Sequence, residues 1–288
     1  MEVNIAIKGG LGNQLFQYAL GVFLKQKYNC AVRYDILPLD KKEKNLTKRS
    51  FLLDRLFTGL KFTGIRTHKL INTNVDTVIM KLYKKTLRTF KRYTYISETA
   101  IAQLDLKPGH TYYLDGYWQS AQSAKHSLDA INACATAVLK NNPYLSLITA
   151  PGESVAIHIR RGDYVNNAFI NSYHGNCGLD YYLNAMKMME SRVSVTTYFI
   201  FSDDLKWAAE NIKSTRPLVF VEGDNNEPVA DLFLMKSCRH QVISNSSFSC
   251  WASYLNTNPG KIVIAPQSWT KKEKTNTMPL FENTWILI

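Results

Sequence analysis

Short runs rich in Val and Ile alternate with helical segments along most of this chain, and this alternation constrains the fold most. The first run, VNIAI, starts at Val3 and precedes residues 15–27, where apolar side chains recur at helical spacing. Five further runs follow, namely SVAIHI, TTYFIFS, PLVFV, QVIS and KIVIA. The first four of these precede helical segments at 179–191, 205–212, 231–238 and 248–255. Because strands that each precede a helix are typical of βα units, we predict an α/β fold with parallel sheets.

The chain length and one break in this alternation predict two domains. The chain has 288 residues, which exceeds the usual size of a single hydrophobic core. The stretch NNPYLSLITAPG, at 141–152, interrupts the alternation and is typical of a domain boundary. We therefore predict an N-terminal α/β lobe over 1–145, a C-terminal α/β lobe over 146–288, and a cleft between them. The first lobe carries a basic, mainly helical insertion over about 41–111.

Positive charge is concentrated in one segment. The formal net charge is +12, and residues 41–92 contain fifteen Lys and Arg against three acids, so this segment accounts for the whole excess. Residues 75–93 place apolar side chains on one stripe with cations around it. That pattern is typical of a helix that contacts anionic lipid, and also of a solvated amphipathic helix. A basic face also fits a nucleic-acid-binding protein, which is the alternative from a different functional class.

Cysteine usage and the N-terminus indicate the cellular setting. The five cysteines are scattered without a CxxC pair, so neither a zinc site nor a disulfide framework is predicted. The start, MEVNIAIKGG, lacks the layout of a signal peptide, and no apolar run is long enough to span a bilayer. We expect a soluble cytoplasmic protein with reduced thiols.

The run SVAIHI ends in polar residues. Alternate side chains of a strand share a face, so His158 and Arg160 lie together at the strand's carboxyl end, where open α/β sheets bind ligands. The planar fork of an arginine suits a phosphate. Asp163 lies in the turn that follows. The alternative interpretation is a surface pair of arginines with Asp163 as partner and a His158 that only packs.

Two further strand ends carry polar residues at a helix start. Asp203 follows TTYFIFS, and its carboxylate can accept hydrogen bonds from a base edge such as that of guanine. Ser246 and Ser247 follow QVIS, where hydroxyl and N–H groups can bind a phosphate. Helix capping is the alternative at both places.

The first run ends in a glycine-rich turn, GGLGNQ, that leads into a helix. Glycines in such a turn let backbone N–H groups approach a ligand, and the helix start favours an anion. The glycines do not complete G-x-G-x-x-G, and the chain contains neither GxxxxGK[ST] nor an Asp-x-Asp pair. The sequence therefore predicts no dinucleotide fingerprint, no ATP-binding P-loop and no metal-held nucleotide.

Three of these stretches, GGLGNQLFQYALG, HIRRGDYV and ISNSSFSCWASYLN, together resemble the bacterial α-1,2-fucosyltransferases, glycosyltransferase family 11. The stretches GYWQS, HGNCGLDYY, FSDDLKW, DLFLMKSCRH and VIAPQSW also fall in the order of that family. The resemblance implies a GT-B fold with two Rossmann-like lobes. It further implies inverting transfer of L-fucose from GDP-L-fucose to the 2-hydroxyl of a terminal β-galactoside, with no metal or other cofactor, in the synthesis of O-antigen or another surface polysaccharide.

The resemblance also implies residue roles. Arg160 would meet the β-phosphate and stabilise the charge that develops on the leaving group. The other donor-binding residues would be Gly10, Gly12, Asn13, Gln14, His158, Asp203, Ser246, Ser247 and Phe248. Trp118 and Gln119, in GYWQS, are expected to bind the acceptor. Asp163 and His174 are the two candidates for the general base.

The resemblance and the basic segment together indicate the partners. The acceptor galactoside is expected on a lipid-linked oligosaccharide, and the basic segment 41–92 would then contact the anionic inner face of the bacterial plasma membrane. No nucleic acid is expected as a partner. A transferase that uses a GDP-sugar other than GDP-fucose is the alternative within the enzyme class.

Overall fold

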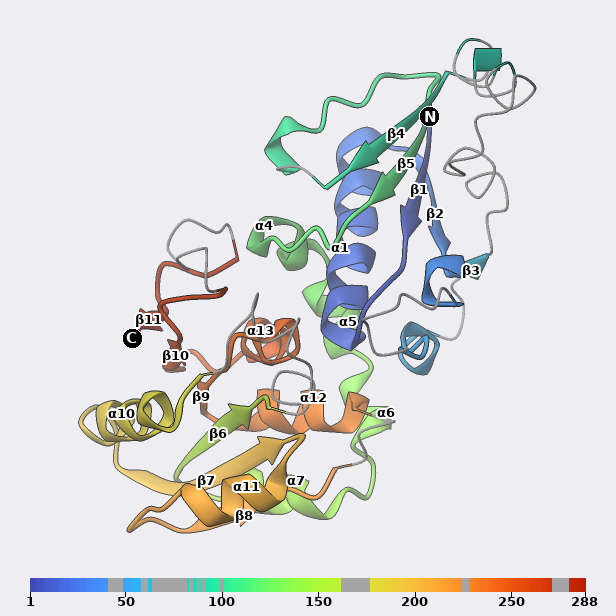
Figure 1. Cartoon of the computed structure of the whole chain (residues 1–288). Coiled ribbons are helices and arrows are strands. Elements are labelled where there is room, and N and C mark those ends of the chain that lie inside the picture. The colour runs from blue at the N-terminus through green and yellow to red at the C-terminus, as the bar shows by residue number, and fades with distance from the viewer. Residues whose placement is uncertain are drawn as a thin grey trace. The chain divides into compact units, whose positions relative to one another are not determined.

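A computed structural model describes residues 1–40, 49–57, 62–63, 82, 85–86, 89, 92–98, 101–161, 177–223, 228–270 and 280–288. The chain forms two compact units, Met1–Ser127 (unit 1) and Leu128–Ile288 (unit 2). Each unit contains one sheet in which every described strand pair is parallel (Figure 1). The α/β fold with parallel sheets is therefore confirmed.

The sheet of unit 1 has the strand order β3-β2-β1-β5-β4. Its strands are β1 (Glu2–Ala6), β2 (Ala31–Asp35), β3 (Phe62–Thr63), β4 (Tyr93–Ser97) and β5 (Thr111–Asp115). The buried strand β1 lies at the centre, where Val3 is opposite both Val32 and Tyr112. Helix α1 (Leu11–Tyr28) connects β1 to β2 and runs alongside the sheet (Figure 1). It begins after Gly10, which has extended backbone, and ends at the left-handed Asn29.

Shorter elements complete unit 1. They are η1 (Leu37–Asp40), η2 (Leu53–Arg55), η3 (Ile101–Gln103), α4 (Ala121–Ala124) and η4 (Lys125–Ser127). Strands β3 and β4 lie inside the segment 41–111 that the sequence predicts to be mainly helical, so that prediction is wrong for these residues. The stretch YTYIS, at 93–97, is rich in aromatic and β-branched side chains, which favour strands. Most of the predicted basic stripe at 75–93 lies outside the described residues, and its last residue, Tyr93, begins β4.

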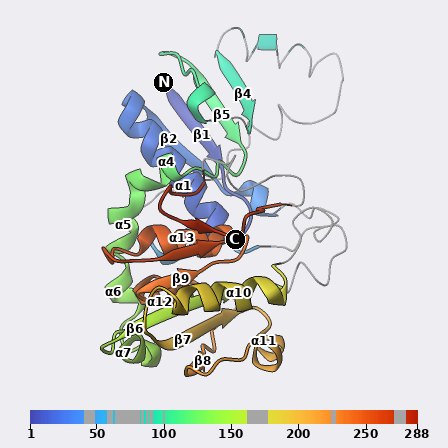
Figure 2. The ribbon, with the colours of Figure 1, turned by 90° about the vertical axis from the view of Figure 1, so that its left-hand side faces the viewer.

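The sheet of unit 2 has the strand order β11-β10-β9-β6-β7-β8. Its strands are β6 (Glu153–Ile159), β7 (Val195–Ser202), β8 (Leu218–Phe220), β9 (His240–Val242), β10 (Val263–Ala265) and β11 (Ile286–Leu287). Four longer helices belong to it, namely α10 (Leu179–Glu190), α11 (Leu205–Asn211), α12 (Val229–Ser237) and α13 (Ser247–Leu255). Figure 2 shows α10 and α12 beside β6 and β7, and side chains of α10 and α11 belong to one buried cluster with the strand residues Val155, Ile157 and Ile159.

Unit 2 begins earlier than the predicted boundary between residues 145 and 146. Helices α5 (Leu128–Asn132), α6 (Ala135–Val138) and α7 (Pro143–Ile148) belong to it. The physical reason lies in their contacts: Asn132 donates from Nδ2 to the carbonyl of Leu255 over 3.3 Å and accepts from Nζ of Lys236 over 2.8 Å. Ile131 of α5 is fully buried. The break at 141–152 is thus a connection inside unit 2.

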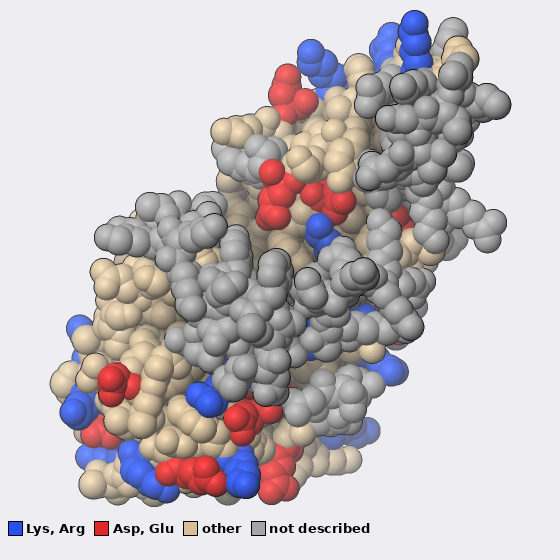
Figure 3. Space-filling view, in the orientation of Figure 1, with Lys and Arg blue, Asp and Glu red and all other residues tan. Residues whose placement is uncertain are grey.

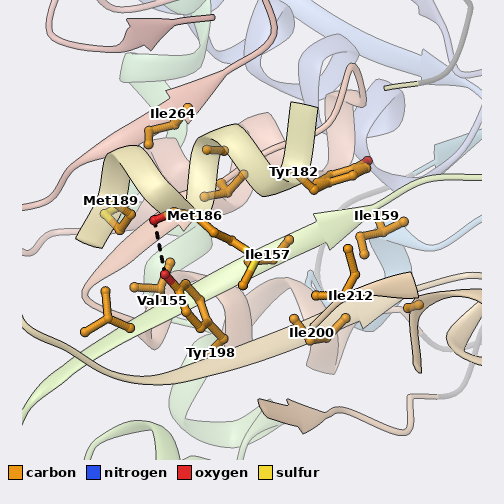
Figure 4. Close-up of a cluster of buried hydrophobic side chains, with 14 residues drawn as sticks. Val155, Ile157, Ile159, Tyr182, Met186, Met189, Tyr198, Ile200, Ile212 and Ile264 are labelled. Carbon is orange, nitrogen blue, oxygen red and sulfur yellow. Dashed lines mark hydrogen bonds between the residues drawn. The ribbon is translucent and has the colours of Figure 1, made fainter. Parts of the chain in front are cut away.

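Strand β6 sorts its side chains onto two faces. Val155, Ile157 and Ile159 are fully buried in a cluster with side chains of α10, among them Met186 and Met189 (Figure 4). His158, at the intervening position, instead contacts Phe248 of α13. The predicted alternation along β6 is therefore confirmed, and it directs a polar side chain toward the face that α13 covers.

Candidate functional site

His158 lies near the carboxyl end of β6 and is 6% exposed. Its Nδ1 lies 2.9 Å from Oγ of Ser244, and its ring centroid lies 5.6 Å from that of Phe248. Burial lowers the pKa of His158 to about 4; Asp203 nearby favours the charged form and Arg160 opposes it. The imidazole is therefore neutral at neutral pH and offers one donor and one acceptor.

Arg160 and Asp203 form a salt bridge between the ends of β6 and β7, which are neighbouring strands. Nη1 of Arg160 lies 2.9 Å from Oδ2 of Asp203, and the two side chains are 24% and 14% exposed. Oδ1 of Asp203 accepts from the backbone N–H of Arg161 over 2.8 Å. The carboxylate thus orients the guanidinium. Because a guanidinium carries five N–H donors, this arrangement is compatible with a second anionic partner.

Arg161 is fixed to helix α11. Its Cζ lies 3.9 Å from the ring centroid of Trp207, and its Nε lies 3.4 Å from Oδ2 of Asp204. Asp204 also caps α11, since its Oδ1 accepts from the N–H of Trp207 over 3.1 Å. The cap is therefore Asp204, whereas Asp203 pairs with Arg160. Capping by Asp203, one of the alternatives, is wrong.

Ser246 and Ser247 lie at the start of α13. Ser246 is the N-cap residue, and its Oγ accepts from the N–H of Phe248 over 3.3 Å. Capping is thus confirmed for Ser246. Ser247 is the first residue of the helix, where backbone N–H groups lack intrahelical acceptors. Such a helix start favours an anion, so capping and phosphate binding are compatible here.

The glycine-rich turn of unit 1 contains several residues predicted to bind the sugar-nucleotide donor, and their surroundings differ. Gly10 precedes α1, and a Cβ there would meet no atom within 4 Å, while Gly12 is buried in the helix. Gln14 is fully buried and bonds to backbone only: Nε2 donates to the carbonyls of Gly9 and Ser50 over 2.9 Å and 2.8 Å. Its Oε1 accepts from the N–H of Leu52 over 3.0 Å. These bonds give Gln14 a structural role in holding the turn.

Asn13 and the predicted acceptor residues lie together. Nε2 of Gln119 donates to Oδ1 of Asn13 over 2.8 Å, so a predicted donor-binding residue and a predicted acceptor-binding residue are in direct contact. Trp118 is 1% exposed and packs in the interior of unit 1. Its side chain is therefore part of the core, and the polar group that this stretch presents is Gln119.

Polar residues that the sequence analysis missed follow three neighbouring strands of unit 1. Lys8 follows β1, Asp115 ends β5, and Glu98 follows β4. Nζ of Lys8 lies 2.8 Å from Oδ1 of Asp115, and the hydroxyl of Tyr95 donates to Oδ2 over 2.7 Å. Figure 3 shows acidic side chains next to a basic one on the visible face of unit 1. Lys8, Asp115 and Glu98 each lie at or just after the end of a strand, and this position was the signal in the sequence that could have identified them.

The two candidates for the general base, Asp163 and His174, lie in 162–176, outside the described residues. In the part of the chain that the structure describes, no group of three or more His, Cys, Asp or Glu side chains could hold a metal ion. Nor does any described helix combine the length and apolar character needed to cross a membrane.

The family described as Glycosyl transferase family 11 matches this sequence over residues 2–288. The chain belongs to glycosyltransferase family 11. It is therefore a glycosyltransferase, as the resemblance implied. The α-1,2-colitosyltransferase of Escherichia coli is 29% identical, over 100% of this chain and 99% of that protein. The O-antigen biosynthesis glycosyltransferase WbnK of Escherichia coli is 31% identical, over 97% of this chain and 98% of that protein.

More distant relatives share a part of this glycosyltransferase. The galactoside α-(1,2)-fucosyltransferase 2 of Bos taurus is 33% identical over 108 residues, which are 36% of this chain and 31% of that protein. Among solved structures, POFUT1 in complex with GDP has a TM-score of 0.51 at 11% identity, over 92% of this chain and 97% of that chain. This similarity supports the fold alone, and the GT-B fold is confirmed.

Proposed function

We propose that this glycosyltransferase transfers L-fucose from GDP-L-fucose to the 2-hydroxyl of a terminal β-galactoside, with inversion, in the synthesis of O-antigen or another surface polysaccharide. The names of its relatives support the linkage and the pathway class. The single observation that carries the chemistry is the salt bridge of 2.9 Å that Asp203 makes to Arg160 at the end of β6.

In the proposed reaction, the acceptor hydroxyl attacks C1 of the donor sugar as the bond from C1 to the β-phosphate oxygen breaks. Negative charge then develops on GDP, and Arg160 stabilises it from an orientation that Asp203 sets. The start of α13, with Ser246, Ser247 and the N–H of Phe248, is the second proposed phosphate contact. These groups would perform the leaving-group task without a metal ion.

The remaining roles are assigned by the same proposal. The neutral imidazole of His158 contacts the nucleoside, since it carries one donor and one acceptor on the face of α13. Asp203 acts on the donor through Arg160, because both of its carboxylate oxygens bond to the two arginines. The proton of the acceptor hydroxyl passes to Asp163 or to His174.

GDP release from GDP-fucose tests this function. The enzyme is incubated with a panel of β-galactosides in EDTA, beside Arg160→Ala and the control Arg161→Ala. We expect acceptor-dependent release that survives EDTA and falls by about 10²–10³ in Arg160→Ala. Arg161→Ala removes the same charge, but the side chain of Arg161 contacts Trp207 and Asp204 instead of Asp203, so GDP release should fall less than in Arg160→Ala. Release that EDTA abolishes would overturn the metal-free role of Arg160.

Colitose is the second candidate donor sugar, because the colitosyltransferase matches this chain over its whole length. Colitose is a fucose that lacks one hydroxyl. A site that hydrogen-bonds this hydroxyl of fucose favours GDP-fucose over GDP-colitose by a factor of about 10⁴–10⁵ in kcat/KM, whereas an apolar site discriminates weakly between them. The ratio of kcat/KM for GDP-fucose to that for GDP-colitose therefore decides between the two donors.

We also propose that the acceptor is lipid-linked and that the basic segment 41–92 brings the enzyme to the cytoplasmic face of the plasma membrane. The fifteen cations of this segment support the proposal, although most of it lies outside the described residues. Binding to vesicles of anionic lipid at low salt, lost at high salt, is expected. Absence of binding at low salt would overturn it.

A further inference from the structure

The carboxylate of Glu98 accepts hydrogen bonds from two consecutive backbone N–H groups. Oε2 lies 3.0 Å from N of Tyr117, and Oε1 lies 2.8 Å from N of Trp118. Glu98 follows β4, and the two N–H groups follow β5, the neighbouring strand. Hydrogen bonds to an ionised carboxylate are stronger than neutral ones, so Glu98 ties the loop 116–119 to the end of β4.

This loop has a backbone that L-residues rarely adopt. Trp118 has a φ of 56°, in the left-handed region, which costs a bulky residue free energy unless its surroundings hold it there. A Cβ on Gly116 would lie 2.7 Å from Cβ of Glu98 and 3.0 Å from the ring of Trp118. The loop is therefore built closely around Glu98 and the buried indole.

The other end of the loop contacts the glycine-rich turn. Nε2 of Gln119 donates to Oδ1 of Asn13 over 2.8 Å, and Nε2 of Gln17 donates to the carbonyl of Gly116 over 3.1 Å. Oε1 of Gln17 in turn accepts from the N–H of Lys8 over 3.0 Å. The backbone that Glu98 bonds at 117 and 118 is thus directly followed by Gln119, whose amide is bonded to Asn13.

We infer that Glu98 is a positioning residue for the acceptor. It holds the loop 116–119 so that Gln119 presents its amide, through its bond to Asn13, to a hydroxyl-rich sugar at the carboxyl edge of the unit 1 sheet. This inference rests on the proposed function. Glu98 itself is exposed, so its removal leaves the buried core of unit 1 intact and changes chiefly the loop.

The substitution Glu98→Gln tests the role, because it keeps the size of the side chain but turns an NH₂ group toward a backbone donor. We expect the KM for a β-galactoside to rise about tenfold, which corresponds to about 1.4 kcal/mol. The KM for the GDP-sugar rises less than that for the galactoside, because only Asn13 of the donor-binding residues contacts Gln119, and the melting temperature stays close to that of the wild type. Glu98→Asp, which keeps the charge, recovers part of the acceptor affinity. Glu2→Gln is the control, since Glu2 pairs with Arg33 at the opposite end of the sheet.

Hydrogen exchange supplies a readout that is independent of the donor sugar. The amides of Tyr117 and Trp118 are expected to exchange slowly in the wild type and faster in Glu98→Gln. An unchanged acceptor KM in an active enzyme overturns the inference and leaves the proposed function standing. If the wild type uses neither GDP-fucose nor GDP-colitose, the proposed function is overturned. If the amides of Tyr117 and Trp118 then also exchange at the same rate in Glu98→Gln as in the wild type, the restraint by Glu98 is overturned as well.

Discussion

His158 makes the stability of the enzyme depend on pH. Burial lowers its pKa to about 4 in the folded protein, whereas an ordinary histidine has about 6.5. As the pH falls, the unfolded chain therefore binds the proton first. The stabilising contribution of neutral His158 is fully present above pH 6.5 and is lost progressively as the pH falls toward 4.

Between pH 7 and pH 5, we expect this loss to reach about 2 kcal/mol. Urea unfolding at the two pH values measures it, with His158→Asn as the control that cannot titrate. The free energy of unfolding should fall more for the wild type than for the variant. Equal falls would mean that the imidazole is solvated or charged in the folded enzyme.

The adjacent glycines of the first turn are expected to respond differently to substitution. Gly9 has a φ of 78°, and a Cβ there would lie 2.7 Å from Nδ2 of Asn13, so Gly9→Ala should lower the free energy of unfolding by about 1–2 kcal/mol. Gly10 has a φ of −76° and open space around it. Gly10→Ala should therefore fold with little change, within about 1 kcal/mol.

Activity separates the two proposed roles of these glycines. If the backbone at Gly10 approaches the donor, Gly10→Ala loses turnover although its stability is kept. Urea midpoints and GDP release on the same preparations give both values. Full activity of Gly10→Ala would leave Gly10 with only a role in the turn.

The start of α13 combines a structural and a proposed binding role, and two substitutions of Ser246 distinguish them. Loss of the N-cap hydroxyl in Ser246→Ala should lower the free energy of unfolding by about 1 kcal/mol, whereas Ser246→Gly costs only a few tenths. Both variants lack the hydroxyl, so both should bind GDP more weakly and to a similar extent. Calorimetric titration with GDP measures this. Unchanged affinity in Ser246→Gly would assign the hydroxyl to capping alone.

The strands differ in how clearly the sequence predicts them. Val155, Ile157 and Ile159 alternate with smaller or polar residues in a long run, and β6 is at the predicted place. Strand β3 has only the residues Phe62–Thr63, and a pattern so short carries no period. It exists because Tyr34 and Asp35 of β2 provide an edge to pair with. Strands of this kind depend on their neighbours more than on their own side chains.

The division into units predicts how fragments of the enzyme behave. Residues 128–288 contain the whole sheet of unit 2 with α5, α6 and α7, so this fragment should fold and bind GDP. A fragment of 146–288, which starts at the boundary predicted from the sequence, lacks Ile131 and the bonds of Asn132 to Leu255 and Lys236. It should melt at a lower temperature or aggregate.

Thermal unfolding and calorimetric GDP titration of the two fragments measure this difference. The full-length enzyme is the reference for GDP affinity. Equal melting temperatures of the two fragments would contradict the assignment of residues 128–145 to unit 2.

The sequence by itself determined the class of fold, the family and the position of the polar strand ends of unit 2. Each of these depends on local spacing. The period of two along SVAIHI placed the side chain of His158 on the other face of the strand from Ile157 and Ile159, and the glycine turn marked the start of α1. The proposal of Arg160 as a phosphate-binding residue uses the same kind of local information, namely its residue type and its place at the end of the strand.

Only the tertiary structure decided which polar residues bond to each other. Asp203 pairs with Arg160 while Asp204 caps α11, although the two aspartates are adjacent in the sequence. Gln14 forms hydrogen bonds to the backbone of residues 50 and 52, and Trp118 is buried. Glu98, which follows β4, accepts a hydrogen bond from the loop that follows β5. The partners of Asp203, Gln14 and Glu98 are far from them along the chain. Spacing in the sequence carries no information about such contacts, because the pairing order of the strands brings them together.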